Sequence, residues 1–102
     1  MTKRLMVTLT NAAEGRDEEF NDWYDNVHIP DVLTIDGVQS AQRFEVEGDD
    51  PAAPHRYLTI YELDREVAAV MGDIIDAMGS GTFTGSESID GSTAAVSFWR
   101  TR

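Results

Sequence analysis

Two kinds of hydrophobic periodicity alternate along this chain, and their order limits the folds that it can adopt. Segments that alternate at every second position, or that are rich in β-branched and aromatic residues, are typical of strands. Apolar residues spaced by about 3.6 positions are typical of amphipathic helices. The helical pattern occurs twice, beginning at residue 16 and at residue 65. The predicted strands cover residues 5–10, 38–47, 56–63 and 94–100.

The predicted order of elements is strand, helix, strand, strand, helix, strand, which is the signature of a ferredoxin-like fold. In this α+β fold a four-stranded antiparallel sheet carries two helices on one face and leaves its other face uncovered. The predicted strands have apolar residues on both faces, and an uncovered apolar face favours burial against a second subunit. We therefore expect one domain, spanning residues 1–102, that assembles as a homodimer.

The first predicted helix carries most of the chemically capable side chains. Acidic residues at 17–19 favour a helix N-terminus, because the helix dipole stabilises negative charge in the first turn. Pro30 is expected to interrupt the helix, since proline lacks the backbone N–H and disfavours a helical conformation in the preceding residue. The apolar stripe of the helix is formed by Phe20, Trp23, Tyr24 and Val27.

Charge and composition exclude several classes of partner and site. Eight basic residues stand against nineteen acidic ones, a formal net charge of −11. Affinity for nucleic acids and anionic lipids depends on Lys and Arg, so we expect neither as a partner. The chain has no cysteine, which excludes disulfides and thiolate chemistry. No apolar run approaches the roughly 18 residues of a membrane span, and no cleavage site follows the first one, so we expect a cytoplasmic protein.

The strongest candidate for chemistry is His28, which lies four residues after Tyr24 and shares its inward-facing stripe. Histidine moves protons near neutral pH, so an inward position beside a cavity would let it act on a bound molecule. Asp31, just past the proline, could orient the imidazole. We therefore predict His28, Asp31 and Tyr24 as catalytic residues. The alternative is that His28 caps the helix C-terminus, where a positive charge is favoured.

A second set of residues is predicted to bind a substrate. Tyr57 and Tyr61 share one face of the third strand, and their hydroxyls could act as donors in an aromatic-walled pocket. Phe44 and Phe98 are expected on neighbouring strands, with Phe44 on the same face as Val38. The alternative for these aromatic residues is ordinary sheet packing.

Arg43 is predicted on the opposite face of the second strand from Phe44. It could hold a carboxylate or enolate oxygen if that face lines the cavity. The alternative is an ion pair with the acidic surface. The glycine-rich segment 79–86 is read either as a mobile lid or as a plain connection.

The sequence lacks several common site motifs. It has no serine nucleophile elbow, no metal-binding spacing and no dinucleotide fingerprint. We therefore expect no metal and no cofactor, with haem as a minor alternative.

One local motif resembles a known family. Gly15-Arg16-Asp17-Glu18-Glu19-Phe20 precedes Trp23, and His28-Ile29-Pro30 follows it, as in the EthD-like branch of the dimeric α/β barrel superfamily. Gly37, Arg43 and the aromatic strand from Tyr57 follow in the same order. The resemblance implies two ferredoxin-like sheets that form an α/β barrel, with the histidine facing its interior. Trp23 is also predicted to bind substrate. The sequence departs from the family in two ways, because the stretch 79–92 is glycine-rich and is not expected to define a pocket mouth, and because no second inward histidine is expected.

Three functions remain open at this point. The first is a cofactor-independent enzyme of dehydratase, isomerase, cyclase or lyase type, acting by His28-mediated proton transfer on an apolar, aromatic or alicyclic metabolite. The resemblance also admits a monooxygenase, cofactor-free or haem-dependent, with His28 as base or axial ligand. The third is a non-catalytic ligand-binding or stress-related dimer. A fold with so many activities does not select one.

Overall fold

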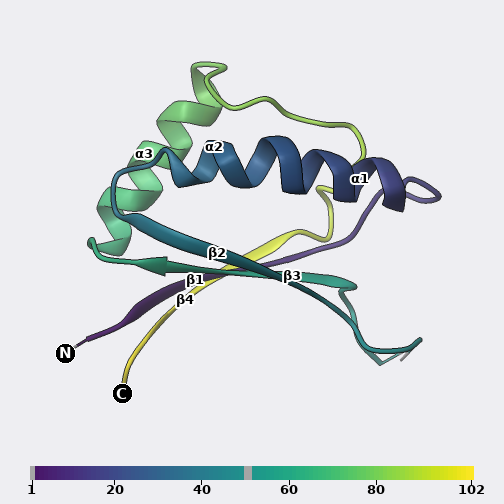
Figure 1. The fold of residues 1–102 in the computed structure, drawn as a ribbon, viewed down its shortest axis with the longest axis horizontal. Coiled ribbons are helices and arrows are strands. Elements are labelled where there is room, and N and C mark those ends of the chain that lie inside the picture. Colours follow the sequence, from purple (N-terminus) through teal and green to yellow (C-terminus); the bar gives the residue numbers. More distant parts are fainter. Residues whose placement is uncertain (1, 50–51) are drawn as a thin grey trace.

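The computed structural model describes residues 2–49 and 52–102, which form a four-stranded antiparallel sheet with helices on one face (Figure 1). The strands are ordered β2–β3–β1–β4, so β1 and β3 are central and β2 and β4 are the edges. This arrangement confirms the predicted ferredoxin-like fold. In chain order the elements are β1 (Arg4–Thr10), α1 (Asp17–Trp23), η1 (Tyr24–His28), α2 (Ile29–Leu33), β2 (Val38–Glu45), β3 (Tyr57–Leu63), α3 (Val67–Gly79) and β4 (Ala95–Arg100).

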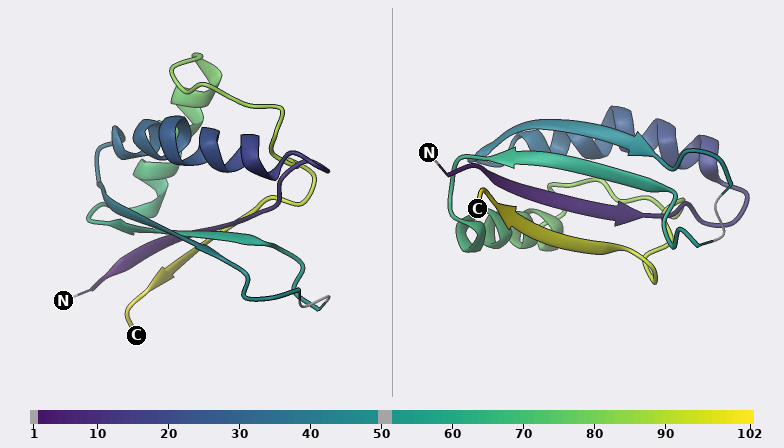
Figure 2. Two further views of the ribbon diagram at one scale, coloured as in Figure 1. Left: turned by 45° about the vertical axis from the view of Figure 1, so that its right-hand side comes forward. Right: turned by 90° about the horizontal axis from the view of Figure 1, so that it is seen from below.

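The helices form a single layer against one face of the sheet. The helix formed by α1, η1 and α2 runs along the β2 side of the sheet, and α3 lies on the β4 side (Figure 2). Seen from below, the opposite face of the sheet carries no helix (Figure 2). No helix in the described part of the chain has the length and apolar character needed to cross a membrane.

The long helix does not break at Pro30, so the predicted interruption is wrong. The segments α1, η1 and α2 follow one another without a gap, and the chain remains helical to Leu33. The turn before the proline is π-helical, and the N–H of Ile29 bonds to the carbonyl of Tyr24, five residues back. A π-turn widens the helix locally, which lets the chain accommodate the proline ring and its missing N–H.

A β-bulge changes the predicted faces of β2. Val38 pairs with Leu63, but Ser40 pairs with Glu62, so Gln39 is the extra residue. The bulge shifts the alternation by one position. Val38 therefore shares the helix-covered face with Arg43, and the prediction that it shares a face with Phe44 is wrong.

The helix-covered face of the sheet holds the core. Along β3, alternate residues from Tyr57 to Leu63 are buried. They pack into two adjoining clusters, one beneath α1 and one beneath α2 and α3. The first contains Phe20, Tyr24 and Tyr57, and the second contains Met6, Val32, Val38, Tyr61, Leu63 and Val70.

Gly37 ends the turn that leads from α2 into β2, and we expect Gly37→Ala to destabilise the fold. Its φ is +97°, and a β-carbon there would lie 2.5 Å from Cβ of Arg65. Residues forced into such backbone regions cost on the order of 1–3 kcal/mol. We expect the free energy of unfolding in urea to fall by about that amount.

Gly72→Ala is the matched control, because Gly72 lies inside α3 and has open space at its β-carbon position. Alanine is favoured over glycine within helices, so this variant is expected to gain about 0.5–1 kcal/mol. Equal effects of the two substitutions would contradict the role assigned to Gly37.

Candidate functional site

A cavity of about 270 Å³ lies between the sheet, the long helix and α3. Apolar side chains form most of its wall, and one imidazole and four hydroxyls are its polar groups. Small-molecule sites have this composition, a largely apolar wall with a few polar groups. The lining residues are Met6, Thr8, Thr10, Tyr24, His28, Val32, Tyr61, Met71, Ile74, Met78, Phe83, Ile89, Ala94, Ala95 and Val96.

His28 is held in the cavity wall by aromatic rings. Its imidazole stacks on the Trp23 indole, with ring centroids 4.8 Å apart and the planes inclined by 24°. The ring of Tyr24 meets it edge-on at 4.8 Å, and Phe83 does so at 6.4 Å. Among residues 2–49 and 52–102, no protein group forms a hydrogen bond to the imidazole. The helix continues beyond His28, so this residue is not the C-terminal cap considered as the alternative.

The surroundings of His28 favour its neutral form. Burial lowers the pKa of the imidazole from its ordinary value of 6.5, and this is the largest effect. The negative charge of Asp31 acts in the opposite direction, whereas the positive charge of Arg43 lowers the pKa further. A neutral imidazole is the form that accepts a proton, so His28 is suited to act as a base near neutral pH.

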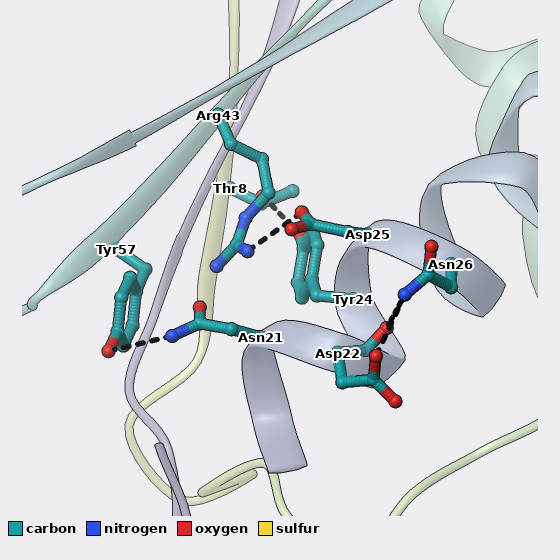
Figure 3. Close-up of polar contacts among 8 residues, drawn as sticks. All are labelled: Thr8, Asn21, Asp22, Tyr24, Asp25, Asn26, Arg43 and Tyr57. Carbon is teal, nitrogen blue, oxygen red and sulfur yellow. Dashed lines mark hydrogen bonds and ion pairs between the residues drawn. The ribbon is translucent and has the colours of Figure 1, made fainter. Parts of the chain in front are cut away.

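Four hydroxyl groups follow β1 along the sheet side of the cavity. The hydroxyls of Thr8 and Tyr24 are hydrogen-bonded at 3.0 Å (Figure 3). Tyr61 pairs with Met6, which is two residues before Thr8 on β1. Thr10 is two residues after Thr8 on the same strand. Tyr61 and Thr10 are 0% and 5% exposed. The Tyr61 hydroxyl lies next to that of Tyr24, and the Thr10 hydroxyl has no hydrogen-bond partner among the described residues.

Arg43 is not among the residues that line this cavity. Its guanidinium lies against the Tyr24 ring (Figure 3). Its guanidinium carbon is 4.5 Å from the ring centroid of Tyr24, 5.3 Å from that of Tyr57 and 5.5 Å from that of Phe20. Its Nη1 donates to Asp25 at 2.9 Å. The remaining nitrogens, Nε and Nη2, are buried and have no hydrogen-bond partner, so the three ring faces are the main contacts of this cation. Arg43 thus forms an ion pair with Asp25, as the predicted alternative has it, and it also lines a separate surface pocket of about 290 Å³ together with Phe44 and Tyr57.

Three further residues predicted to bind substrate also lie outside the cavity lining. The hydroxyl of Tyr57 donates to Asp17 at 2.6 Å and accepts from the Asn21 amide at 3.3 Å. Phe44 is 44% exposed, because it lies on the uncovered face of the sheet. Phe98 packs against the larger core cluster. The last two residues do not lie on neighbouring strands as predicted, since β2 and β4 are opposite edges of the sheet.

Asp31 and Trp23 hold the loop that follows α3. Asp31 was predicted to orient the imidazole, but within the described chain it forms no hydrogen bond to that ring. The carboxylate of Asp31 accepts a hydrogen bond from the Thr84 N–H at 3.0 Å. The indole Nε1 of Trp23 donates to the Thr84 carbonyl, also at 3.0 Å. Both backbone polar groups of Thr84 are therefore fixed by the long helix. Together with His28 and Phe83, Trp23 and Thr84 also line a second cavity, of about 300 Å³, beneath this loop.

Sequence reasoning missed two kinds of lining residue. The hydroxyls of Thr8 and Thr10 lie on the inward face of β1, and the alternation of that strand was a signal that could have found them. Phe83 and Ile89 come from the loop between α3 and β4, which was not expected to define a pocket. No pattern in that stretch identifies which of its residues turn inward.

Comparison with known proteins gives the family of this chain. A family model described as a domain of unknown function, DUF4286, matches residues 5–69. The chain belongs to the DUF4286 family. No curated protein matches this DUF4286 chain in sequence.

Solved structures show that the DUF4286 chain has the fold of the EthD-like branch. A candidate monooxygenase from Shewanella loihica PV-4 matches with a TM-score of 0.67 and 12% identity, covering 100% of this chain and 97% of that one. An ethyl tert-butyl ether D (EthD) family protein from Bacillus halodurans C-125 matches with a TM-score of 0.53 and 15% identity, over 100% and 98% of the two chains. A dimeric ferredoxin-like protein of unknown function from Thermobifida fusca YX matches with a TM-score of 0.53 and 9% identity, over 96% and 90%.

The lowered pKa of His28 predicts a pH dependence of stability. The unfolded chain binds a proton at His28 near pH 6.5, whereas the folded DUF4286 chain does so only at a lower pH. The contribution of His28 is therefore complete above about pH 6.5 and is lost as the pH falls toward the folded pKa. NMR titration of the imidazole is expected to give a pKa below 6.5.

The same effect can be measured by urea unfolding between about pH 7.5 and pH 5.5, on either side of the unfolded pKa. Wild type is expected to lose more stability over this interval than His28→Asn, which has no titrating group at this position. An imidazole pKa at or above 6.5, or identical pH profiles of the two proteins, would contradict the burial described for His28.

Proposed function

We propose that this protein binds a small, mostly apolar molecule between its sheet and helices and transfers a proton on it, with His28 as the general base. The observation that carries the proposal is the position of the His28 imidazole, which has no hydrogen bond to the described residues, in the wall of an apolar cavity. Dehydration, isomerisation, cyclisation and lyase reactions of activated substrates all begin with such a transfer. A positioned base typically contributes 10²–10⁴-fold to the rate of such a step. The proposed chemistry needs no cofactor.

The other predicted residues take different roles in this proposal. Trp23 fixes the plane of the imidazole by stacking on it, and Tyr24 presents a hydroxyl to the same cavity. Asp31 acts through the loop, because its carboxylate holds Thr84. Arg43 acts from behind the Tyr24 ring and helps to keep His28 neutral. Trp23 therefore sets the orientation of the imidazole, Arg43 lowers its pKa, and Asp31 fixes the loop beside it.

The second candidate is a cofactor-free monooxygenase, which the likeness to the candidate monooxygenase of Shewanella loihica favours. The same base would remove a proton from an oxidisable hydroxyarene, and the resulting anion would react with dioxygen. A haem-dependent reaction fits less well. The cavity of about 270 Å³ is smaller than the roughly 300–1,000 Å³ of sites for drug-sized ligands, and a haem is larger than most such ligands.

Substitution of His28 tests the proposed base. Wild type and His28→Gln are screened by thermal shift against hydroxylated aromatics, lactones and enones, and each stabilising compound is followed by product analysis and oxygen uptake. Glutamine keeps a polar side chain but accepts no proton near neutral pH, so we expect conversion to fall by about 10²–10⁴-fold while binding persists. Oxygen consumption during conversion would select the monooxygenase. Equal stabilisation of both proteins without conversion would reject the proton transfer and leave a ligand-binding dimer.

We also propose that the chain forms a homodimer through the uncovered face of its sheet. This face carries a continuous set of apolar side chains that no helix covers, which is unusual on a monomer surface. The structural relative from Thermobifida fusca is described as dimeric. The apolar residues on this face are Leu5, Val7, Leu9, Phe44, Leu58, Ile60 and Trp99.

Replacement of Ile60 by glutamate tests the interface. Ile60 pairs with Val7 near the middle of the uncovered face, so Ile60→Glu places a charge within the proposed contact. We expect sedimentation analysis to show a dimer for wild type and a monomer for this variant, since an unpaired buried charge is strongly unfavourable. Ile75→Glu is the matched control, because Ile75 is 60% exposed on α3, in the helix layer. A monomeric wild type, or dissociation caused equally by both substitutions, would reject this interface.

A further inference from the structure

The two cavities that His28 lines lie on different sides of the helix layer. The first includes residues of β1, β3 and β4, so it lies against the sheet and is called the inner cavity. The described lining of the second belongs to the long helix, the end of α3 and the loop that follows, and it is called the outer cavity. That loop crosses the helices on the side away from the sheet (Figure 1). The imidazole therefore lies between a cavity on the sheet and a cavity beneath the loop.

The boundary between the cavities is formed by side chains that a bound molecule can contact. The residues that line both cavities are His28, Met78, Phe83 and Ile89. None of the four is fully buried, and Met78 is 65% exposed. A methionine side chain is unbranched and adapts its shape to its neighbours, so the space beside the imidazole can widen without a change of the backbone. A molecule in contact with His28 can thus extend into both cavities.

Size and charge restrict the molecule that occupies both cavities. Their volumes are about 270 Å³ and about 300 Å³, and together they fall within the roughly 300–1,000 Å³ of sites for drug-sized ligands. None of the described residues that line either cavity is Asp, Glu, Lys or Arg. An ion would therefore lose its hydration without gaining a counter-charge. The molecule that fits this pair of cavities is uncharged.

The walls of the two cavities differ in the end of the molecule that they suit. Aliphatic side chains from the sheet and α3 dominate the inner cavity, which suits an apolar group. Gly85 has no side chain, so its part of the outer wall is peptide backbone. No described residue bonds to the N–H or the carbonyl of Gly85, and the Ser86 hydroxyl lies next to it in the chain. The outer cavity therefore suits a group that forms hydrogen bonds.

We infer that the molecule on which this protein acts is uncharged and elongated, with an apolar body in the inner cavity, a polar end in the outer cavity, and its reacting carbon between them beside His28. The inference rests on the proposed proton transfer, because the proposed base is one of the residues that both cavities share. Contacts on both sides of the imidazole would hold the reacting carbon in place, and such positioning lowers the barrier to the transfer.

Two uncharged ketones of different length test the inference by isothermal titration calorimetry. They are propiophenone and 6-hydroxy-1-phenylhexan-1-one, which share a phenyl ring and an acidic CH₂ group next to the carbonyl. Only the second has a tail that can enter the outer cavity. Burial of one CH₂ group strengthens binding by about fourfold, and ordering of the tail offsets part of this gain. We expect wild type to bind the long ketone about tenfold more tightly than the short one.

NMR locates the two ends of the long ketone in its complex with wild type. We expect intermolecular NOEs from its phenyl ring to the side chains of Met71 and Ile74, which line only the inner cavity. Its terminal CH₂OH group is expected to give NOEs to the α-protons of Gly85, which lines only the outer cavity. The short ketone is expected to give the first set of NOEs and not the second.

Two glycine variants assign the gain in affinity to the outer cavity. Gly85 and Gly91 lie in the same loop, have open space at the β-carbon position and have no positive φ, so both accept a side chain. Gly85→Leu places a side chain at the outer wall and is expected to bind the long ketone about tenfold more weakly than wild type, with unchanged affinity for the short one. Gly91→Leu is the matched control, because Gly91 lines neither cavity, and it is expected to bind both ketones like wild type.

Several outcomes would overturn the inference. They are failure of both ketones to bind, equal affinity of wild type for the two, and NOEs from the tail to Met71 or Ile74 in place of Gly85. Equal weakening of the long ketone by Gly85→Leu and Gly91→Leu would also overturn it.

Deuterium exchange at the CH₂ group next to the carbonyl separates this inference from the proposed base. In this exchange His28 takes a proton from the carbon, the C–H electron pair passes into an enolate, and a deuteron from the solvent forms the new bond. Exchange that is lost in His28→Gln, without contact between the tail and Gly85, would retain the base and reject the elongated substrate. Contact between the tail and Gly85, without exchange that depends on His28, would retain the binding mode and reject the base.

Discussion

The continuity of the long helix through Pro30 is the constraint on which the candidate site depends. The π-turn at Tyr24–His28 lets the helix pass the proline, so that Tyr24, His28 and Asp31 belong to one rigid element. If the helix ended at His28, the imidazole would lie at a frayed terminus and Asp31 would belong to a separate segment. Single π-turns within α-helices are frequently found at functional sites. Here the turn carries the two residues, Tyr24 and His28, that face both the cavity and each other.

Electrostatics connect the inside of the cavity to a group that lies outside it. The Arg43 guanidinium stacks on one side of Tyr24, and His28 meets the same tyrosine from another direction. A positively charged group inside the cavity would bind anions, and its effect on the pKa of His28 would differ from one bound molecule to the next. Placed behind an aromatic ring and paired with Asp25, the charge biases the protonation of His28 without contacting a ligand.

The fold could be predicted from the sequence, whereas much of the site could not. Hydrophobic periodicity is a local property, and it was sufficient for the order of strands and helices and for the inward direction of His28. Predictions that needed the relative position of two strands were weaker. The bulge at Gln39 reversed the faces assigned within β2, and the strand order separated Phe44 from Phe98. The roles of Asp31 and Tyr57 depend on partners 53 and 40 residues away, at Thr84 and Asp17, and spacing along the chain contains no information about such contacts.

The attachment of Thr84 has a kinetic consequence. Its N–H and its carbonyl are both bonded to the long helix, through Asp31 and Trp23, beside the ring of Phe83 that closes on His28. Displacement of this loop from the helix would require both bonds to break. Release of a molecule past this loop would then depend on the residues that hold Thr84, and its binding would depend on the residues around the imidazole. Trp23 belongs to both groups, because the indole that stacks on the imidazole also donates one of the two bonds.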